Sequence, residues 1–407
     1  ESALMEIRPI ISAMLRNRTG AILVALQIAI TLAVVTNALF IINQRLEKIG
    51  RPSGMDTENL IFVQSYGYRP DYNHKVTIEE DLALMRAMPG VISASAITGI
   101  PLSGGGSSTS YKASPDKSSP DVPGNYYEVD EKGVDTLGVK LVAGRTFSKD
   151  VVRFEENRNN SQFVPEIIVT RDMAKALFGT DENAVGKQVY DTLGQSTTIV
   201  GVIDHMLGAW VDWDKLAQVV FHPVVQPPPF VRYAVRAEPG RRDALIAELE
   251  KKLTESNPTR VISWVRPHTY YIERSYKPDA RMAVLLSVAI ALLVTMTTLG
   301  IVGLASFSVN ARTKQIGTRR AVGATKLDIL RYFMVENWIL TSAGLVVGCI
   351  LAYVFSYWLS TAYSLPSLKL SYVLLAIPCM WILGQLAVLV PARRAASVPP
   401  AVATRTV

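Results

Sequence analysis

Long apolar stretches dominate the pattern of hydrophobic and polar positions along this 407-residue chain. Four of them run for 26, 30, 32 and 23 residues without a charged side chain, at positions 19–44, 282–311, 337–368 and 370–392. A bilayer core of roughly 30 Å needs about 20 helical residues to cross it. We therefore predict four transmembrane helices, at 19–44, 282–311, 325–365 and 370–392. Four buried helices of a soluble protein are the alternative, but such helices keep a polar face.

The segment between the first two predicted spans, residues 45–281, has shorter and more regular patterns. Near its start, "NLIFV" is followed by "IEEDLALMRAMPG" with helical spacing and then by "VISASAI". Near its end, "RYAVRAE", "GRRDALIAELEKKLTE" and "RVISWV" repeat this strand–helix–strand order. We predict that these two βαβ units, within 45–120 and 220–275, form one α+β layer.

The middle of this segment, residues 121–219, is predicted to be a β-rich insert. Strand patterns occur at "YYEVD", "VKLVAG", "EIIVT", "KQVYD", "TTIVGVID" and "AQVVFHP", with one short helix at "RDMAKALFG". Residues 104–124 are rich in Ser, Gly and Pro, and residues 153–163 are polar and charged, so both are predicted to be mobile loops. The fold class is therefore an α-helical membrane protein with an inserted α+β domain.

The charge distribution predicts the orientation in the membrane. Residues 1–18, 311–336 and 391–407 carry a net charge of +8, whereas residues 45–281 carry −2. Because Arg and Lys favour the cytoplasmic side, we expect both termini in the cytoplasm and the inserted domain outside. Residues 1–18 would form a cytoplasmic amphipathic lead and residues 393–407 a cytoplasmic tail. The pI of about 9.2 follows from this topology, so nucleic-acid binding is not expected.

The first span is not expected to be a cleaved signal peptide. Its apolar run is too long, and no small-residue cleavage site follows before Arg45. Both cysteines, Cys349 and Cys379, fall inside predicted spans, so the inserted domain needs no disulfide.

Candidate catalytic and metal-binding residues are few. The pair Asp204-His205 suggests a metal ligand or a general base, but no second ligand has a helpful spacing, and a structural histidine is the preferred interpretation. No G-x-x-x-x-G-K-[ST] motif occurs, and "GGGSSTS" lacks the lysine that contacts nucleotide phosphates. We predict a non-catalytic chain without catalytic, metal-binding or cofactor-binding residues.

The loop "NARTKQIGTRRAVGATKLDIL", residues 310–330, joins the second and third spans. Its spacing of i, i+3, i+4 and i+7 predicts a short amphipathic helix with one shared face, formed by Ile316, Arg319, Arg320 and Gly323. Gly323 can end that helix in the left-handed conformation. Thr325 followed by Asp328 predicts a capping box at the start of the next helix. Positive-inside charge alone is the alternative, but it requires neither the glycine nor the cap.

Small residues recur inside the predicted spans. In the third span they stand four apart, at Gly344, Gly348 and Ala352, which allows close helix contact. Packing between spans of one subunit is the preferred interpretation of this stripe. Gly300, Gly303 and Ser306 are further small residues, in the second span.

Several adjacent segments resemble one family, the MacB/FtsX-type permeases of ABC transporters. The inserted domain resembles that family at "YYEVDEKGVDTLGVKLVAGRTFSKD" and at "IIVTRDMAKALFG" followed by "IVGVIDH". The loop "ARTKQIGTRRAVGATKLDIL" and the tail "PARRAASVPPAVATR" resemble it in the membrane part. The chain departs from the family pattern at Asp135, Gln315 and Thr318, where the family favours an aromatic, an acidic residue and isoleucine.

The resemblance implies that residues 312–324 form a coupling helix that docks on a separate ABC ATPase subunit, which binds ATP and Mg and drives this chain. Arg319 and Arg320 would pair with acidic groups there, and Ile316 would fill an apolar notch. The predicted coupling residues are Arg312, Gln315, Ile316, Gly317, Arg319, Arg320, Gly323 and Ala324. A second permease copy or paralogue is a further implied partner, and in the family's dimer arrangement Gly300, Gly303 and Ser306 of the second span would pack against the first span of the other subunit. A periplasmic adaptor and an outer-membrane channel are also implied as partners. The chain itself would lie in the bacterial inner membrane.

Three functions follow as hypotheses. In the first, a permease subunit converts ATP-driven movement of its partner into movement of a periplasmic domain, which exports or extracts substrate. In the second, an FtsX-like regulatory subunit uses the same ATP-driven movement to activate a cell-wall hydrolase or to transmit a signal. The third, a membrane-tethered enzyme, would need a catalytic set that the sequence does not contain in recognisable form.

Overall fold

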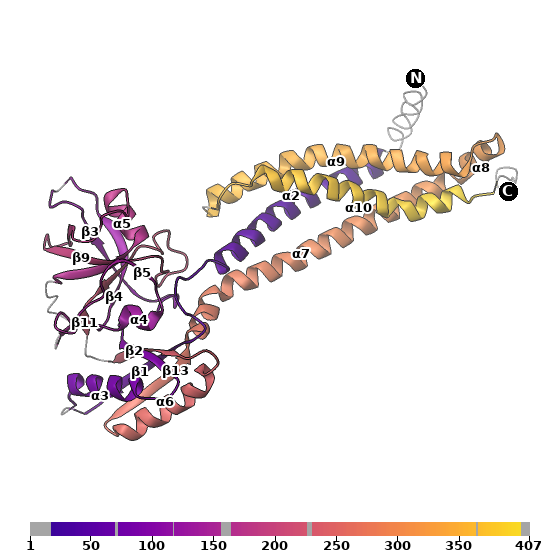
Figure 1. The fold of residues 1–407 in the computed structure, drawn as a ribbon. Coiled ribbons are helices and arrows are strands. Elements are labelled where there is room, and N and C mark those ends of the chain that lie inside the picture. The colour runs from indigo at the N-terminus through magenta and orange to yellow at the C-terminus, as the bar shows by residue number, and fades with distance from the viewer. Residues whose placement is uncertain are drawn as a thin grey trace. The chain divides into compact units, whose positions relative to one another are not determined.

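A computed structural model describes residues 18–69, 72–116, 118–155, 164–225, 230–363 and 365–399. The chain divides into two compact units, and Figure 1 shows their helices and strands. The membrane unit comprises Glu1–Gly50 and Asp279–Val407, and the inserted domain comprises Arg51–Pro278. The predicted amphipathic lead lies almost entirely outside the described residues.

Within the described residues, four helices are long and apolar enough to cross a membrane, in agreement with the predicted four spans. They are α2 (Arg18–Ile49), α7 (His268–Ala311), α9 (Lys326–Tyr363) and α10 (Leu370–Ala396). The short helix α8 (Thr313–Ala321) connects α7 to α9. α7 and α9 both begin well before their charge-free stretches, because polar residues can continue a helix outside the hydrocarbon region.

The small residues of α9 pack against α2 of the same chain. A Cβ atom on Gly344 would lie 2.7 Å from the carbonyl oxygen of Ala25, and one on Gly348 would lie 3.0 Å from Cα of Ala29. Ala352 is fully buried, and its carbonyl oxygen accepts a hydrogen bond of 3.0 Å from Asn37 Nδ2. The stripe therefore serves packing within one subunit, the preferred of the two interpretations.

Gly300 does not make the predicted contact with another subunit but packs within its own chain. A Cβ atom there would lie 2.4 Å from the side-chain oxygen of Gln27, so Gly300 packs against α2 of its own chain. Gln27 Nε2 also donates to the carbonyl oxygen of Met296, at 3.0 Å. A Cβ atom on Gly303 would meet no other described atom within 4 Å, so Gly303 stays a candidate for contact with another subunit.

A buried carboxylate joins α2 to α7. Asp279 lies 2.8 Å from Arg45 Nη1 and 2.6 Å from Lys48 Nζ, through its two oxygens. The Asp279 side chain is only 7% exposed, so the ion pairs are much less screened than surface pairs. This three-residue cluster, the α2–α7 clasp, ties the two helices at the end of the apolar region.

The first sheet of the inserted domain has the strand order β13-β1-β12-β2, and every neighbouring pair is antiparallel. The two predicted βαβ units interleave in it, since β12 lies between β1 and β2 while β1 lies between β12 and β13. Its elements are β1 (Leu60–Gly67), α3 (His74–Arg86), β2 (Val91–Ala96), β12 (Val231–Ala237), α6 (Arg242–Ser256) and β13 (Arg260–Pro267). The predicted single layer built from both ends of the domain is confirmed.

A buried ion pair lies between this sheet and its helices. The guanidinium of Arg260 pairs with the carboxylate of Asp81, and their side chains are 0% and 3% exposed. Tyr233 Oη donates to the same carboxylate at 2.7 Å, and Arg260 Nη2 donates to the carbonyl oxygen of Leu253 at 2.6 Å. Burial raises the pKa of Tyr233 well above its ordinary value, so its hydroxyl stays a donor.

The second sheet is mixed, with the order β3-β4-β10-β7-β9-β5 and with β8 paired to β9. Its strands are β3 (Ser107–Tyr111), β4 (Val122–Glu128), β5 (Leu141–Gly144), β7 (Glu166–Thr170), β8 (Gln188–Tyr190), β9 (Ser196–Ile203) and β10 (Val219–His222). The remaining elements are α4 (Gly133–Leu137), α5 (Arg171–Phe178) and the two-stranded pair β6 (Arg153–Phe154) and β11 (Val224–Val225).

The prediction of a loop over 104–124 was wrong in part. Ser107–Tyr111 pairs with β4 along its whole length, although serine and threonine give it almost no apolar pattern. Pairing with a buried neighbouring strand decides its conformation, because intrinsic β-propensity depends strongly on context. In the second predicted loop, Arg153–Phe154 forms β6, and residues 156–163 lie outside the described residues.

The two sheets share one hydrophobic core. Side chains of β1 alternate between its faces: Leu60 and Phe62 pack with Tyr127 and Phe221 of the second sheet, whereas Ile61 and Val63 pack under α3 and α6. Tyr271 of α7 also packs into the shared core. The first turns of α7 are therefore an integral part of the inserted domain.

Two histidines of the inserted domain are buried in their neutral form. His222 Nε2 lies 2.7 Å from Tyr111 Oη, and the ring stacks on Tyr126. His268 Nε2 lies 2.8 Å from the carbonyl oxygen of Pro101. Burial lowers the pKa of each ring from 6.5 to about 4, and the Pro101 carbonyl opposes this only partly at His268.

We expect the inserted domain to lose stability as the pH falls from about 6.5 to 4. The unfolded chain protonates both histidines near pH 6.5, whereas the folded domain excludes these protons until about pH 4. Each histidine therefore costs about 1.4 kcal/mol per pH unit within this window. Urea unfolding of the full chain at several pH values measures the slope. A His222→Gln, His268→Gln double variant with an unchanged slope would contradict the assignment.

Candidate functional site

The connection between α7 and α9 is held rigidly at its start. Arg312, the residue between α7 and α8, donates from Nη1 to both carboxylate oxygens of Glu336 at 3.1 Å and to Tyr332 Oη at 3.3 Å. Glu336 lies on α9 and is only 9% exposed. Arg312, predicted to contact a partner protein, is therefore an internal tie between the start of α8 and α9.

One face of α8 packs against the membrane unit itself. Ile316 is 5% exposed and belongs to the same apolar core as Phe333 of α9 and Ala392 of α10. Arg320 Nη1 donates to the carbonyl oxygens of Ala396 and Val398, at 3.1 and 2.8 Å. An arginine at this place satisfies carbonyl groups that the end of a helix leaves unpaired, so it fixes α8 to the end of α10.

The opposite face of α8 is exposed and combines charge with apolar surface. Gln315, Thr318, Arg319 and Val322 follow i, i+3, i+4, i+7 spacing and are all exposed. Val322 is 85% exposed, more than any other large apolar side chain in the described part of the chain. The guanidinium of Arg319 lies 5.0 Å from the ring centre of Tyr332, which positions it without burying its charge. We call these four residues the outer face of α8.

The structure corrects the predicted helix face. Ile316 and Arg320 point into the membrane unit, whereas Arg319 lies on the outer face. Ile316 cannot fill a notch in a partner, because it already fills one in its own chain. The predicted face starts at Ile316, whereas the exposed face with the same i, i+3, i+4, i+7 spacing starts one residue earlier, at Gln315.

A sharp turn and a capped helix follow α8. Gly323 has φ +109°, a conformation that favours glycine, and its N–H lies 3.2 Å from the carbonyl oxygen of Arg320. Ala324 N–H donates to the carbonyl oxygen of Arg319 at 3.0 Å. Thr325 N–H donates to Asp328 Oδ2 at 2.8 Å, while Asp328 N–H lies 3.2 Å from Thr325 Oγ1, which is the reciprocal pattern of a capping box.

Two exposed apolar residues of this connection, Val322 and Leu327, were not predicted from the sequence pattern. Leu327, in the first turn of α9, is 69% exposed and stands on the same connection as Val322. An apolar residue between Arg320 and Gly323 was the available signal, since a purely topogenic basic loop has no use for it. Gly317, also a predicted coupling residue, is buried on the inner side of α8.

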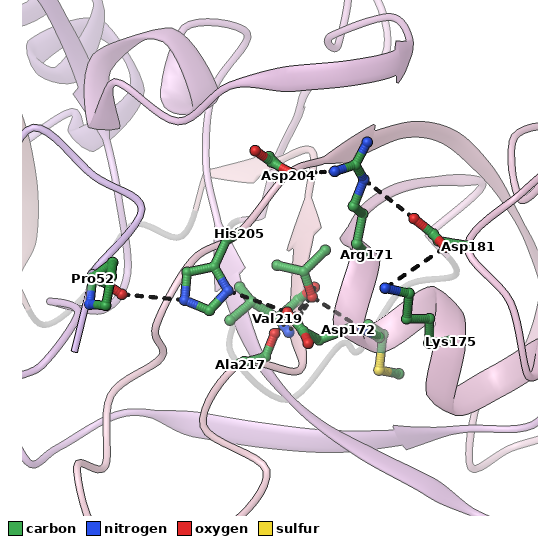
Figure 2. Close-up of polar contacts among 11 residues, drawn as sticks. Pro52, Arg171, Asp172, Lys175, Asp181, Asp204, His205, Ala217 and Val219 are labelled. Carbon is green, nitrogen blue, oxygen red and sulfur yellow. Dashed lines mark hydrogen bonds and ion pairs between the residues drawn. The ribbon is translucent and has the colours of Figure 1, made fainter. Parts of the chain in front are cut away.

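The other sequence candidate, Asp204-His205, does not form a catalytic pair. Figure 2 shows the two side chains with separate partners: Asp204 pairs with Arg171, whereas His205 Nδ1 lies 3.2 Å from Asp172 Oδ2. His205 Nε2 lies 3.2 Å from the carbonyl oxygen of Pro52. The histidine thus links α5 to the chain that enters the domain, in agreement with a structural role.

The surroundings of Arg171 are an ion-pair network of the domain surface. Its guanidinium also lies 3.2 Å from Asp181, which in turn lies 3.8 Å from Lys175. Within the described ranges, no group of three or more His, Cys, Asp or Glu residues is arranged to hold a metal ion. The outer face of α8 is therefore retained as the candidate functional site.

Comparisons with known families match almost the whole described chain. A model of the MacB-like periplasmic core domain matches residues 21–252, which is more than half of the sequence. A model of the FtsX-like permease C-terminal region matches residues 286–400 and so includes the outer face of α8.

Similar curated proteins carry both ATP-binding and permease functions in their names. A macrolide export ATP-binding/permease protein MacB of Chromobacterium violaceum is 26% identical over 278 residues, which cover 65% of this chain and 40% of that protein. A probable syringafactin export ATP-binding/permease protein of Pseudomonas syringae pv. tomato is 25% identical over 295 residues, covering 69% of this chain and 42% of that protein. The chain therefore spans well under half the length of these relatives.

Among solved structures, the periplasmic region of MacB from Actinobacillus actinomycetemcomitans is 16% identical to this chain. The match covers 55% of this chain and 94% of that one, with a TM-score of 0.33. At this score the structural match adds nothing to the family models.

Proposed function

The chain belongs to the MacB-like, FtsX-like family of ABC transporter permeases, and on this basis we propose that it converts the movement of an ATP-binding partner into movement of its inserted domain. The movement would drive export or extraction of a substrate from the outer side of the membrane. The outer face of α8 is the observation that carries this proposal. This face presents the cation of Arg319 and the exposed side chain of Val322, and the two ends of the helix are fixed to α9 and α10.

A helix that transmits force to the spans must be fixed to them, and α8 is tied to α9 and α10. The Arg312–Glu336 ion pair fixes its start to α9, and Arg320 fixes its last turn to α10. A push on Val322 or Arg319 would therefore displace α9 and α10 rather than bend a loop. The alternative, a loop that serves only for orientation, requires neither of these ties.

The proposed movement reaches the inserted domain through α7, whose residues belong in part to each unit. α7 is one helix from His268 to Ala311, and its first turns belong to the core of that domain. The α2–α7 clasp at Asp279 joins this helix to α2 beside Pro278, the last residue of the inserted domain. A proline inside a helix removes one backbone hydrogen bond and is a natural point of bending.

The surroundings of the chain are part of the proposal. We place it in a bacterial inner membrane with both termini cytoplasmic, next to an ABC ATPase that binds ATP and Mg. A second permease copy would pack on α7, where Leu285, Leu292 and Leu299 form an exposed row beside the open position at Gly303. Amphiphiles are the proposed class of exported substrate, since the relatives are named for the export of macrolides and of syringafactin. A periplasmic adaptor and an outer-membrane channel would complete the path.

Reconstitution tests the proposal. The full chain and the ATP-binding protein that co-purifies with it are placed in nanodiscs, and spin labels on α6 and on the outer end of α2 report distances. We expect the distance distribution to change between the ATP-bound and nucleotide-free states. A distribution that stays the same while ATP is hydrolysed would exclude mechanical transmission. Stimulation of ATP hydrolysis by an exported amphiphile separates transport from a purely regulatory output.

Removing the α2–α7 clasp should uncouple the two ends of the lever. In Asp279→Asn, the cations of Arg45 and Lys48 lose their buried partner charge, which typically costs about 3–5 kcal/mol in a buried pair. We expect ATP hydrolysis to persist while the nucleotide-dependent distance change shrinks or disappears. Asp214→Asn, which removes a 74% exposed carboxylate of the inserted domain that lies 3.3 Å from Lys215, is the control. A full distance change in Asp279→Asn would show that the clasp carries no movement.

A further inference from the structure

A large, partly open cavity lies in the inserted domain, and neither α8 nor the α2–α7 clasp contributes to its lining. Its volume is about 940 Å³, at the upper end of the 300–1,000 Å³ that small-molecule sites occupy. Both sheets line it, through β1, β12 and β13 on one side and β3 and β4 on the other, and the first turns of α7 close one wall. Nothing in the proposed coupling mechanism uses this space.

Positive charge predominates in the cavity lining. Three arginines, Arg232, Arg266 and Arg274, face a single carboxylate, Glu128. Arg266 and Arg274 form no ion pair with a carboxylate among the described residues. Arg232 is held in place by hydrogen bonds to the carbonyl oxygen of Thr98 at 2.6 Å and to Gln64 Oε1 at 3.1 Å. Arg232 is thus held in a fixed position, while Arg266 and Arg274 present guanidinium groups that no carboxylate of the described residues neutralises, which suits an oxyanion.

Aromatic groups stand next to these charges. Trp264 and Tyr271 line the cavity, and the Arg266 guanidinium lies 5.9 Å from the Trp264 ring and 4.6 Å from the Tyr270 ring. The Tyr271 side chain is 92% buried, yet its hydroxyl has no hydrogen-bond partner within the distance and angle limits of a good bond among the described residues. Burial raises the pKa of this hydroxyl to about 12, against the opposing effect of Arg266 and Arg232, so it stays a neutral donor.

We propose that this cavity binds an anionic amphiphile, a molecule that joins a carboxylate or phosphate to a flat apolar ring. Arg266 and Arg274 would hold the oxyanion, the Tyr271 hydroxyl would donate a hydrogen bond to it, and the ring would lie against Trp264. Arginine pairs with carboxylate and phosphate through two parallel hydrogen bonds, which makes it selective for such groups. Aromatic faces favour offset stacking with a second ring. Binding at this cavity is independent of the coupling role of α8, because it needs neither ATP nor a partner protein.

Calorimetric titration of the full chain in phosphatidylcholine nanodiscs tests the proposal, with empty nanodiscs as the blank. The probe is 2-naphthoate, and its matched neutral counterpart is 2-naphthamide, which keeps the ring and loses the charge. We expect 2-naphthoate to bind at least about tenfold more tightly than 2-naphthamide or inorganic phosphate, since charge-assisted hydrogen bonds and ring contacts both contribute. A second titration with phosphatidylglycerol in the nanodisc identifies the source of the natural anion. Competition indicates a lipid headgroup, and an unchanged affinity indicates a soluble ligand.

Three variants locate the binding site. Arg266→Gln, Arg274→Gln and Trp264→Leu should each weaken 2-naphthoate binding by about tenfold. Arg241→Gln removes an arginine of the same domain that lies outside the cavity, pairing at 3.9 Å with Glu248, and should bind as the unchanged chain does. Retained affinity in all three cavity variants would overturn the proposal. So would an equal loss in Arg241→Gln, which would indicate attraction to net charge alone, or equal binding of 2-naphthoate and 2-naphthamide.

Discussion

Charge reversal on the outer face of α8 should separate the chain from its ATP-binding partner. In Arg319→Glu, an exposed cation of the outer face becomes an anion beside the acidic groups that we expect on the partner. Losing one member of an interfacial charge pair costs about 2–5 kcal/mol, which is a loss of affinity of about thirtyfold or more. Co-purification of the ATP-binding protein with the tagged full chain from native membranes measures the effect. Val322→Asp should have the same result, because it places a charge in an apolar contact.

Two further variants distinguish docking from other effects of charge. Arg331→Glu reverses an exposed arginine of α9 on the same side of the membrane unit, but off the outer face, and should co-purify the partner normally. Arg320→Glu should instead lower the thermal stability of the purified chain, because Arg320 binds the last carbonyl groups of α10. An Arg319→Glu chain that still retains its partner would show that the basic loop serves only to orient the spans.

Breaking the buried ion pair of the first sheet should destabilise the inserted domain severely. In Asp81→Ala, the guanidinium of Arg260 and the hydroxyl of Tyr233 lose their common acceptor while remaining buried. Removing one member of a buried ion pair costs about 3–5 kcal/mol, a large part of the about 5–15 kcal/mol that stabilises a typical domain. Urea unfolding of the full chain, followed by tryptophan fluorescence, measures the loss.

Comparison of paired and single substitutions identifies the cause. An Asp81→Leu, Arg260→Met double variant should recover much of the loss, because it leaves no unpaired charge in the core. Glu255→Gln removes a member of an exposed pair with Lys251 and should change the free energy of unfolding by less than about 1 kcal/mol. If Asp81→Ala unfolded at the same urea concentration as Glu255→Gln, the ion pair would be irrelevant to stability.

The sequence predicted those parts of the fold in which local pattern and tertiary packing agree. Residues 282–311 have no charged side chain, so only a span suits them, and Ile61 and Val63 alternate with Leu60 and Phe62 as a doubly buried strand requires. The strand Ser107–Tyr111 was not predicted, because it depends on pairing with β4 rather than on its own residues. The cavity was not predicted for a similar reason. Its residues Gln64, Arg232 and Arg266 come together only when three strands, far apart in sequence, pair in one sheet.

At the coupling site, sequence reasoning identified the segment but not its orientation. Both Arg319 and Arg320 suit a basic docking surface, and their different roles depend on where α10 ends. Helical periodicity defines a set of possible faces, but the buried one is decided by contacts with α9 and α10. Val322 was overlooked because a single valine in a basic loop has no motif, and only its 85% exposure distinguishes it.

Site-specific photocrosslinking tests the docking of the outer face most directly. A benzophenone amino acid at position 322 should crosslink to the ATP-binding protein in native membranes, because Val322 lies bare on the outer face. The same amino acid at position 316, which is buried against α9 and α10, should not. Crosslinking at position 316 with none at position 322 would contradict the assignment of this face as the point where force enters the chain.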